Sequence, residues 1–276
     1  GMSRLRRAFI RTVERVSGQP QLRELYLSWS RDRRLEEDVF DAGLRLLGIA
    51  VRQSWHVHAA TVPRQGGLLL VANHPFGIVD GLALGQIGMT LRGNVKVLTH
   101  SLLCQPPEIA PHLLPIDFSG TAQARRVSAQ SRRQSIELLE AGQVVTIFPA
   151  GGIATANAPF RGRAFDGAWH GFVSRLATIP GVTTVPVFFS GQNSRLFQIA
   201  SHLSYPLRIA LIFHETRRRM GRSIDLQIGA PIPAERALAL GLVTIQRVMA
   251  WARRFAASTT QRYDQLLLDC QRLLAG

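Results

Sequence analysis

The sequence is short of cysteine, aromatic residues and long apolar runs, and each shortage excludes a class of protein. Its two cysteines, Cys104 and Cys270, lie far apart, so they do not form the framework of a small disulfide-stabilised domain and are typical of a reducing compartment. No apolar stretch approaches the roughly 20 residues that a membrane-spanning helix needs. Charged residues at positions 11, 14 and 15 interrupt the apolar residues near the N-terminus, so no signal peptide is expected.

Two common catalytic motifs are missing as well. Without a Gly-x-Ser-x-Gly nucleophile elbow, an α/β-hydrolase is disfavoured. Without a Gly-x-x-x-x-Gly-Lys loop, a P-loop nucleotide site is excluded. Aromatic residues make up only 7% of the chain and are not interleaved with the basic ones, which argues against a nucleic-acid-binding protein.

Acidic residues are scarce beside basic ones. The chain has 33 Lys and Arg against 18 Asp and Glu, a net charge of +15 and a pI of about 11.5. Lys96 is the only lysine, and a GC-rich genome would also produce such an excess of arginine. The planar guanidinium of arginine forms bidentate hydrogen bonds with phosphate and carboxylate groups. We therefore expect anionic partners, such as an anionic membrane surface, a nucleotide-bearing co-substrate or an acidic carrier protein.

Apolar residues make up 46% of the chain, the composition of a globular protein with a substantial core. The pattern predicts one α/β domain, with a largely parallel mixed sheet flanked by helices on both faces. Strands are predicted at 67–72, 94–98, 113–117, 143–148, 183–189, 207–213 and 223–228, the last two paired through a turn at 217–222. Helices are predicted at 3–16, 20–50, 79–89, 121–140, 169–177 and 234–275. The expected division is a helical extension over 1–60, a core over 61–232 and a helical segment over 233–276.

The segment 3–16 has the pattern of a basic amphipathic helix, with apolar residues on one face and arginines on the others. Such a helix can lie in a lipid interface. It can equally dock on its own domain, and the sequence leaves both readings open.

The first candidate site is the segment from Asn73 to Asp80, directly after a predicted strand. In parallel sheets, functional groups gather on loops beyond the carboxyl ends of strands. His74 is suited to accept a proton near neutral pH. Asp80, six positions on, can bind one ring nitrogen and leave the other free as a base. In the alternative reading, Asp80 only caps the next helix and His74 bonds a backbone group.

The second candidate site is the glycine-rich loop after the predicted strand 143–148. Its sequence is Phe148-Pro149-Ala150-Gly151-Gly152-Ile153, which exposes backbone N–H groups where a ligand oxygen can approach. Alone, this pattern fits an ordinary turn equally well.

Together, Asn73-His74-Pro75, the Ile147–Ile153 block and Val185-Pro186-Val187 resemble the glycerolipid and lysophospholipid acyltransferase family, in particular its hemolysin-like or lyso-ornithine-lipid-type branch. Further marks of the resemblance, which covers about residues 67–232, are Trp169 and the run from Gly191 to Phe197.

The resemblance implies a fatty-acyl transfer from an acyl-CoA or acyl-carrier-protein thioester to the hydroxyl of a lyso-lipid. The donor is a co-substrate, and no bound cofactor or metal is implied. His74 would be the catalytic base and Asp80 its orienting partner. The protein would lie peripherally on the cytoplasmic face of the membrane. The implied substrate-binding residues are Asn73, Phe76, Gly77, Phe148, Pro149, Ala150, Gly151, Gly152 and Pro186.

The sequence departs from the family pattern in three places. Five residues instead of four separate His74 from Asp80, and we expect Gly77 to absorb the extra one. The second block lacks the arginine that holds an acceptor phosphate. In the third block, Ala150 and Gly152 replace a glutamate and a threonine. We expect a lyso-lipid with a head group other than simple glycerol phosphate. Arg161 and Arg163 are candidates for the missing positive charge, or else solvated surface residues.

Other candidates have weaker support. His56 and His58 share a face but lack a third metal ligand. Cys104 lacks a catalytic partner. The arginines of helix 121–140, namely Arg125, Arg126, Arg132 and Arg133, share much of one face, either to meet the carrier, cofactor or membrane or simply as solvated residues. The competing function is a non-catalytic lipid-binding or membrane-associated protein on the same scaffold.

Overall fold

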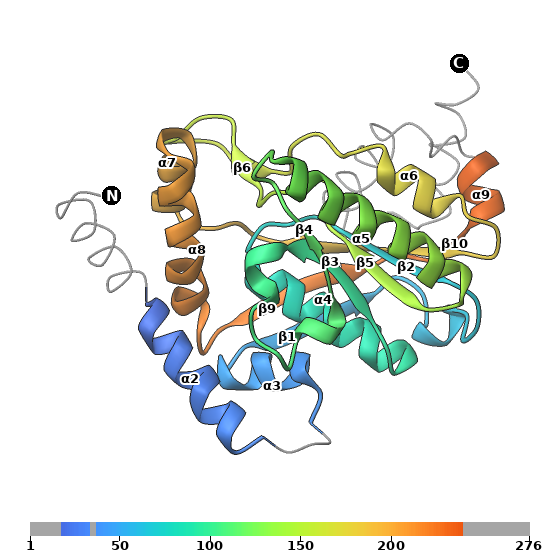
Figure 1. Cartoon of the computed structure of the whole chain (residues 1–276), viewed down its shortest axis with the longest axis horizontal. Coiled ribbons are helices and arrows are strands. Elements are labelled where there is room, and N and C mark those ends of the chain that lie inside the picture. The colour runs from blue at the N-terminus through green and yellow to red at the C-terminus, as the bar shows by residue number, and fades with distance from the viewer. Residues whose placement is uncertain (1–17, 34–36, 240–276) are drawn as a thin grey trace.

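The computed structural model describes residues 18–33 and 37–239 (Figure 1). The helix predicted at 3–16 and most of the one predicted at 234–275 lie outside these residues. The helices are α2 Gln19–Arg31, α3 Val39–Leu46, α4 Ile78–Arg92, α5 Ala122–Glu140, α6 Phe172–Ala177, α7 Arg195–Leu203, α8 Tyr205–Arg219 and α9 Ala234–Ala239. The strands are β1 Ala50–Trp55, β2 Leu68–Ala72, β3 Lys96–His100, β4 Leu113–Ile116, β5 Val144–Ile147, β6 Thr155–Ala156, β7 Ala164–Phe165, β8 Thr183–Ser190, β9 Ser223–Ile228 and β10 Ile232–Pro233. Short 3-10 turns span Ala59–Thr61, Ser101–Cys104 and Ala110–His112.

The centre of the fold is an eight-stranded sheet in the order β1-β9-β8-β2-β5-β3-β4, with β10 beside β8. All neighbouring strands on the path are parallel except β8 and β9, and β10 also runs antiparallel to β8. The predicted α/β class with a largely parallel mixed sheet is therefore confirmed. The carboxyl ends of β2, β5, β3 and β8 share one edge, which is where the candidate loops emerge.

Strand β2 shows that both faces of the sheet are covered. Successive side chains of a strand point to opposite faces, yet all five residues of β2 are buried. Leu68 and Leu70 belong to the apolar cluster formed with α3 and α4, whereas Leu69 and Val71 belong to the cluster formed with α5 and α6. An uninterrupted apolar run is what such a doubly covered parallel strand requires.

The predicted strand at 207–213 is wrong, because this segment forms the middle of helix α8. Its apolar run, Leu207-Arg208-Ile209-Ala210-Leu211, fits a buried strand or a packed helix equally well by periodicity alone. The deciding signal is Pro206 in the first turn of the helix, where proline is favoured. Strand β9 accordingly does not pair with this segment and instead lies between β1 and β8.

The long helix predicted over 20–50 is also corrected. The segment instead forms two helices, α2 and α3. Asp38 caps the start of α3, where its side chain accepts hydrogen bonds from the backbone N–H groups of Phe40 and Asp41. The chain then turns at Gly48, which has a φ of 61°, and enters the sheet as β1. Part of the range expected to be a helical extension thus supplies an edge strand.

Helix α4 packs closely on α3 through glycine. A Cβ built on Gly85 would lie 2.2 Å from Cδ1 of Phe40, whose ring is buried. We predict that Gly85→Ala lowers the free energy of unfolding by about 1–3 kcal/mol, because overpacking forces the ring or the helix to shift. Urea unfolding measures this change.

Gly81→Ala is the matched control, since a Cβ on Gly81 of the same helix would meet no atom within 4 Å. It should leave stability unchanged or raise it by up to about 1 kcal/mol through helix propensity. Equal destabilisation by both substitutions would contradict the packing explanation.

Candidate active site

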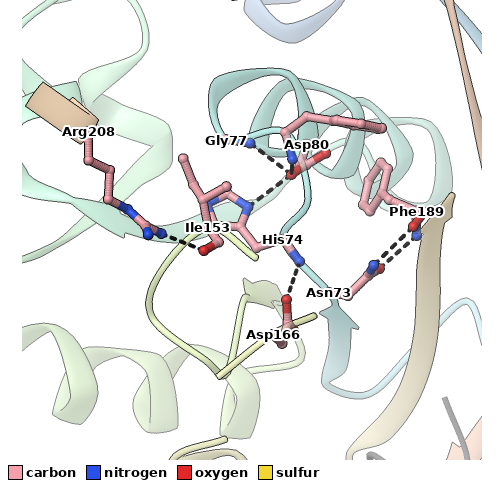
Figure 2. A network of polar contacts seen from close by, with 9 residues as sticks. Asn73, His74, Gly77, Asp80, Ile153, Asp166, Phe189 and Arg208 are labelled. Atoms are coloured by element: carbon pink, nitrogen blue, oxygen red, sulfur yellow. Dashed lines mark hydrogen bonds and ion pairs between the residues drawn. The ribbon is translucent and has the colours of Figure 1, made fainter. Parts of the chain in front are cut away.

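The loop between β2 and α4 is fixed at its start by Asn73. Its side-chain amide donates to the carbonyl of Phe189 at 2.9 Å, and its side-chain oxygen accepts from the Phe189 N–H at 2.7 Å (Figure 2). The two bonds continue the pairing of β2 with β8 beyond the end of β2. They set where the next residue, His74, leaves the sheet.

His74 and Asp80 are brought together by this loop. The imidazole Nδ1 lies 3.1 Å from Oδ2 of Asp80, within hydrogen-bonding distance but without the alignment of a good hydrogen bond (Figure 2). The His74 side chain is 18% exposed. Among the described residues, nothing hydrogen-bonds the other ring nitrogen, Nε2. The arrangement leaves one nitrogen facing a carboxylate and the other available.

The carboxylate of Asp80 also organises the loop backbone. It is fully buried at the start of α4, and its Oδ2 accepts from the N–H groups of Phe76 at 2.7 Å and Gly77 at 3.0 Å. Acidic side chains are favoured in this first turn. Asp80 is therefore a helix cap and the neighbour of His74 at once, so the two readings of the sequence are not exclusive.

Gly77 makes the tight return possible. Its φ of 88° is one that residues with a Cβ rarely adopt. A Cβ there would also lie 2.8 Å from Cδ1 of Ile153. The turn thus uses the freedom expected of Gly77, and the absent side chain lets the glycine-rich loop approach.

The glycine-rich loop after β5 covers the other side of His74. The ring of Phe148 stacks on the imidazole, with centroids 4.1 Å apart and planes inclined by 26°. The carbonyl of His74 accepts from the N–H of Ala154 at 2.7 Å, and the carbonyl of Pro149 accepts from the N–H of His170 at 3.0 Å. Two loops far apart in the sequence are thereby joined into one site.

Asp166, which the sequence reading missed, supports the backbone of His74. Its Oδ1 accepts from the His74 N–H at 3.0 Å (Figure 2). Its Oδ2 accepts from the Trp169 indole N–H at 3.0 Å. Burial raises the pKa of the Asp166 carboxyl, although these hydrogen bonds and the nearby imidazole oppose the rise. Trp169 was part of the family resemblance, but no sequence pattern pointed to Asp166, the residue that its indole binds.

Helix α8 presents one stripe of side chains to these loops. Arg208 donates to the Ile153 carbonyl and the Thr155 hydroxyl, and Ile212 lies against Gly77. Glu215 accepts from the N–H and the hydroxyl of Ser194. The spacing of the stripe is that of a single helix face. Reading 207–213 as a strand hid this face, which is why Arg208 was missed.

Arg219 ends the stripe beside the loop that carries His74. Its guanidinium carbon lies 3.4 Å from the centroid of the Phe76 ring, and one terminal nitrogen donates to the Gln192 carbonyl at 2.9 Å. Burial lowers the pKa of Arg219, and the charge of Asp80 opposes that effect. A Cβ on Gly191 would lie 2.8 Å from the far edge of the same ring, so Phe76 is held between arginine and glycine.

The remaining expected residues are placed less centrally. Ala150 and Gly152 lie in the glycine-rich loop, and Gly151 turns it with a φ of 66°. Pro186 sits within β8, in register with Val71. Arg161 and Arg163 are exposed and make no hydrogen bond or ion pair within the described ranges, so they agree with the solvated reading.

The weaker candidates gain no support. Burial raises the pKa of Cys104, which keeps its thiol protonated and unreactive. No group of three or more potential metal ligands occurs within 18–33 and 37–239, so His56 and His58 have no third ligand there. The four arginines of α5 are exposed.

An exposed apolar cluster surrounds His100 at the end of β3, on the same edge of the sheet. The Tyr205 hydroxyl lies 3.5 Å from its Nε2, and the ring of Phe118 lies 5.4 Å from its ring. Phe118 also borders Gly151 of the glycine-rich loop. Leu102, Phe118, Leu203 and Tyr205 are 48–73% exposed, and we call these four residues the His100 cluster.

Comparison with known proteins identifies the class. The sequence profile described as Acyltransferase matches residues 35–234, well over half of the chain. The chain therefore belongs to the acyltransferase family. Both candidate loops and helix α8 fall inside the matched range.

Two curated relatives are lyso-glycine lipid O-acyltransferases. The protein of Phocaeicola vulgatus is 30% identical over 183 residues, which are 62% of this chain and 61% of that protein. The match thus spans about three fifths of that relative's length. The protein of Bacteroides thetaiotaomicron is 26% identical over 220 residues, 76% of this chain and 75% of that protein.

One solved structure is similar to this chain at a lower sequence identity. The 1-acyl-sn-glycerophosphate (LPA) acyltransferase PlsC of Thermotoga maritima aligns with 80% of this chain and 78% of its own, at 15% identity and a TM-score of 0.45. That score is too low to say anything about the site.

The raised pKa of Asp166 predicts a pH effect on stability. A carboxyl whose pKa is raised by folding binds its proton more tightly in the native state, so its contribution to stability grows as the pH falls toward about 4, the unfolded value. We expect the free energy of unfolding of the wild type, relative to Asp166→Asn, to increase as the pH is lowered from 8. Urea unfolding across this range measures it.

Asp225→Asn is the control, because Arg52 lowers the pKa of that carboxyl and its contribution changes only below about pH 4. A wild-type advantage over Asp166→Asn that stays flat or shrinks as the pH falls would contradict the assignment.

Proposed function

We propose that this protein transfers a fatty-acyl group from a thioester to the hydroxyl of a lyso-lipid, with His74 as general base and Asp80 as its orienting partner. One observation carries the proposal: the buried carboxylate of Asp80 lies 3.1 Å from Nδ1 of the partly exposed His74. Family membership supports the reaction class.

In the proposed step, Nε2 of His74 takes the proton of the acceptor hydroxyl as its oxygen attacks the thioester carbonyl. The tetrahedral intermediate then collapses, the carbon–sulfur bond breaks, and the thiolate takes the proton back from His74. Asp80 keeps the remaining proton on Nδ1, so that Nε2 is the base. The contact between Nδ1 and Oδ2 can tighten when substrate binds, as catalytic hydrogen bonds often do.

The backbone near Gly77 is a poor source of oxyanion donors. The N–H groups of Phe76 and Gly77 both already donate to Asp80. The N–H groups of Gly152 and Ile153 make no hydrogen bond among the described residues. We therefore propose the glycine-rich loop for this role.

The acceptor we favour is a lyso-lipid with an amino-acid head group. Both curated relatives are named for lyso-glycine lipid. The second and third family blocks also lack the polar residues expected for glycerol phosphate. The donor is an acyl-CoA or an acyl-carrier protein, both of which suit the basic surface.

The same surface supports peripheral membrane binding. The His100 cluster exposes four large side chains, of which Phe118 borders the glycine-rich loop, and exposed arginines line α5. Apolar residues that enter the lipid, with cations near anionic head groups, are the usual means of interfacial binding. No helix in the described part of the chain is long and apolar enough to cross a bilayer. A lipid-binding protein without activity would need the apolar cluster but not the His74–Asp80 pair, which favours the enzyme.

The first test of the proposal is His74→Ala, assayed by thiol release from decanoyl-CoA with a panel of lyso-lipids. Loss of a positioned base should lower turnover by about 10²–10⁴-fold. Asp80→Asn should lower it as well, because the carboxylate no longer selects the tautomer.

His58→Ala is the control, since His58 is exposed and caps a short turn after β1, which runs antiparallel to β2 and so ends at the opposite edge of the sheet from His74. Wild-type turnover in His74→Ala, or equal losses in both histidine variants, would rule out the proposed base.

The membrane proposal predicts that the double variant Leu203→Gln/Tyr205→Gln binds phosphatidylglycerol vesicles about 10-fold or more weakly, because two apolar side chains no longer enter the lipid. Vesicle cosedimentation measures it. The control, Leu27→Gln/Leu238→Gln, removes two exposed leucines outside the His100 cluster. Equal binding of the two double variants would contradict a role for the cluster.

A further inference from the structure

Arg208 sits beside the active site with an unusual set of contacts. One terminal nitrogen donates to the carbonyl of Ile153 (Figure 2). The other donates to the hydroxyl of Thr155 at 2.7 Å. Its guanidinium carbon lies 5.2 Å from the centroid of the Phe197 ring. Ile153 in turn touches Gly77, and the next residue bonds the His74 carbonyl. A single residue, Ile153, therefore lies between the guanidinium of Arg208 and Gly77 of the loop that carries His74.

The charge of Arg208 is not neutralised within the described ranges. Arg45, Arg52 and Arg133 each pair with a carboxylate at 2.5–2.8 Å, but those three arginines lie on the exposed surface. Arg208 is half-buried, and no carboxylate lies within 4 Å of it among the residues described. Burial lowers its pKa, as expected for a charge partly withdrawn from water without a counter-ion. Such a charge is costly unless an anion completes the site.

The guanidinium also has spare donors and an open approach. Arginine has five N–H groups in a planar fork, and two hydrogen bonds from Arg208 to protein oxygens are present. A Cβ on Gly152 would lie 3.9 Å from one terminal nitrogen, so the glycine leaves that side uncrowded where the family has threonine. A carboxylate or phosphate fits the remaining donors in a bidentate pair.

We propose that Arg208 binds an oxyanion of the substrate, a carboxylate or a phosphate, and so selects which molecules His74 can acylate. The inference rests on the proposed function and adds a candidate recognition group, on α8, to Arg161 and Arg163. Tyr205, one turn earlier on α8, belongs to the exposed His100 cluster. An amphiphile with its charged head on Arg208 would thus meet apolar residues along the same helix.

The test uses Arg208→Gln, which keeps hydrogen-bond donors for Ile153 and Thr155 but removes the charge. One acceptor pair is a hydroxy-fatty-acyl glycine and its methyl ester. One donor pair is decanoyl-CoA and decanoyl-N-acetylcysteamine, which lacks phosphate. We expect KM to rise about 10-fold or more for the anionic member of one pair and to stay within twofold for its neutral counterpart. The pair that responds identifies whether the oxyanion belongs to the acceptor or to the donor.

Two control variants separate recognition from structure. Arg195→Gln makes the same change at an exposed arginine on α7 and should leave every KM unchanged. Thr155→Ala removes a loop contact of Arg208 without removing charge, so any effect should be equal within each pair. Equal changes in charged and neutral substrates for Arg208→Gln, or none, would overturn the proposal. Absence of turnover by the wild type would instead refute the proposed function.

Discussion

The site depends on one buried carboxylate. Asp80 lies at the first turn of α4, where its Oδ2 accepts two backbone N–H groups and faces the Nδ1 of His74. Burying an ionised carboxylate is costly unless hydrogen bonds and charge compensate. The two N–H groups at Oδ2 and the start of the helix provide part of this compensation, while Oδ1 has no hydrogen-bond partner among the described residues. The same group that closes the loop therefore also lies against the imidazole, and in the proposed mechanism it orients that ring.

Helix α8 is the second element on which the site depends. One face of it reaches the glycine-rich loop through Arg208, the loop that carries His74 through Ile212 and Arg219, and the loop after β8 through Glu215. Three loops from separate strands are thus fixed against one rigid helix. Sites held on rigid elements keep the geometry that proton transfer demands.

The sequence predicted the parts of the fold that follow from local pattern. The apolar run of β2, the turn at Gly77 and the helix after it are each specified by neighbouring residues, and so was the approach of Asp80 to His74. Asp166 could not be found this way, because a carboxylate 92 residues from its backbone partner leaves no local trace. Arg208 was hidden by a segment whose apolar run fits strand and helix alike. Arg161 and Arg163 were named because they follow the glycine-rich loop in sequence, whereas the arginine that bonds that loop, Arg208, comes from α8.

The central claim is that Asp80 holds the proton of neutral His74 on Nδ1 and leaves Nε2 as the base. Two-bond ¹H–¹⁵N NMR correlation of the labelled protein, above the pKa of the imidazole, distinguishes the two tautomers directly. We expect the Nδ1–H tautomer for His74 in the wild type and a mixed or inverted population in Asp80→Asn. A wild-type His74 that carries its proton on Nε2 would contradict the mechanism.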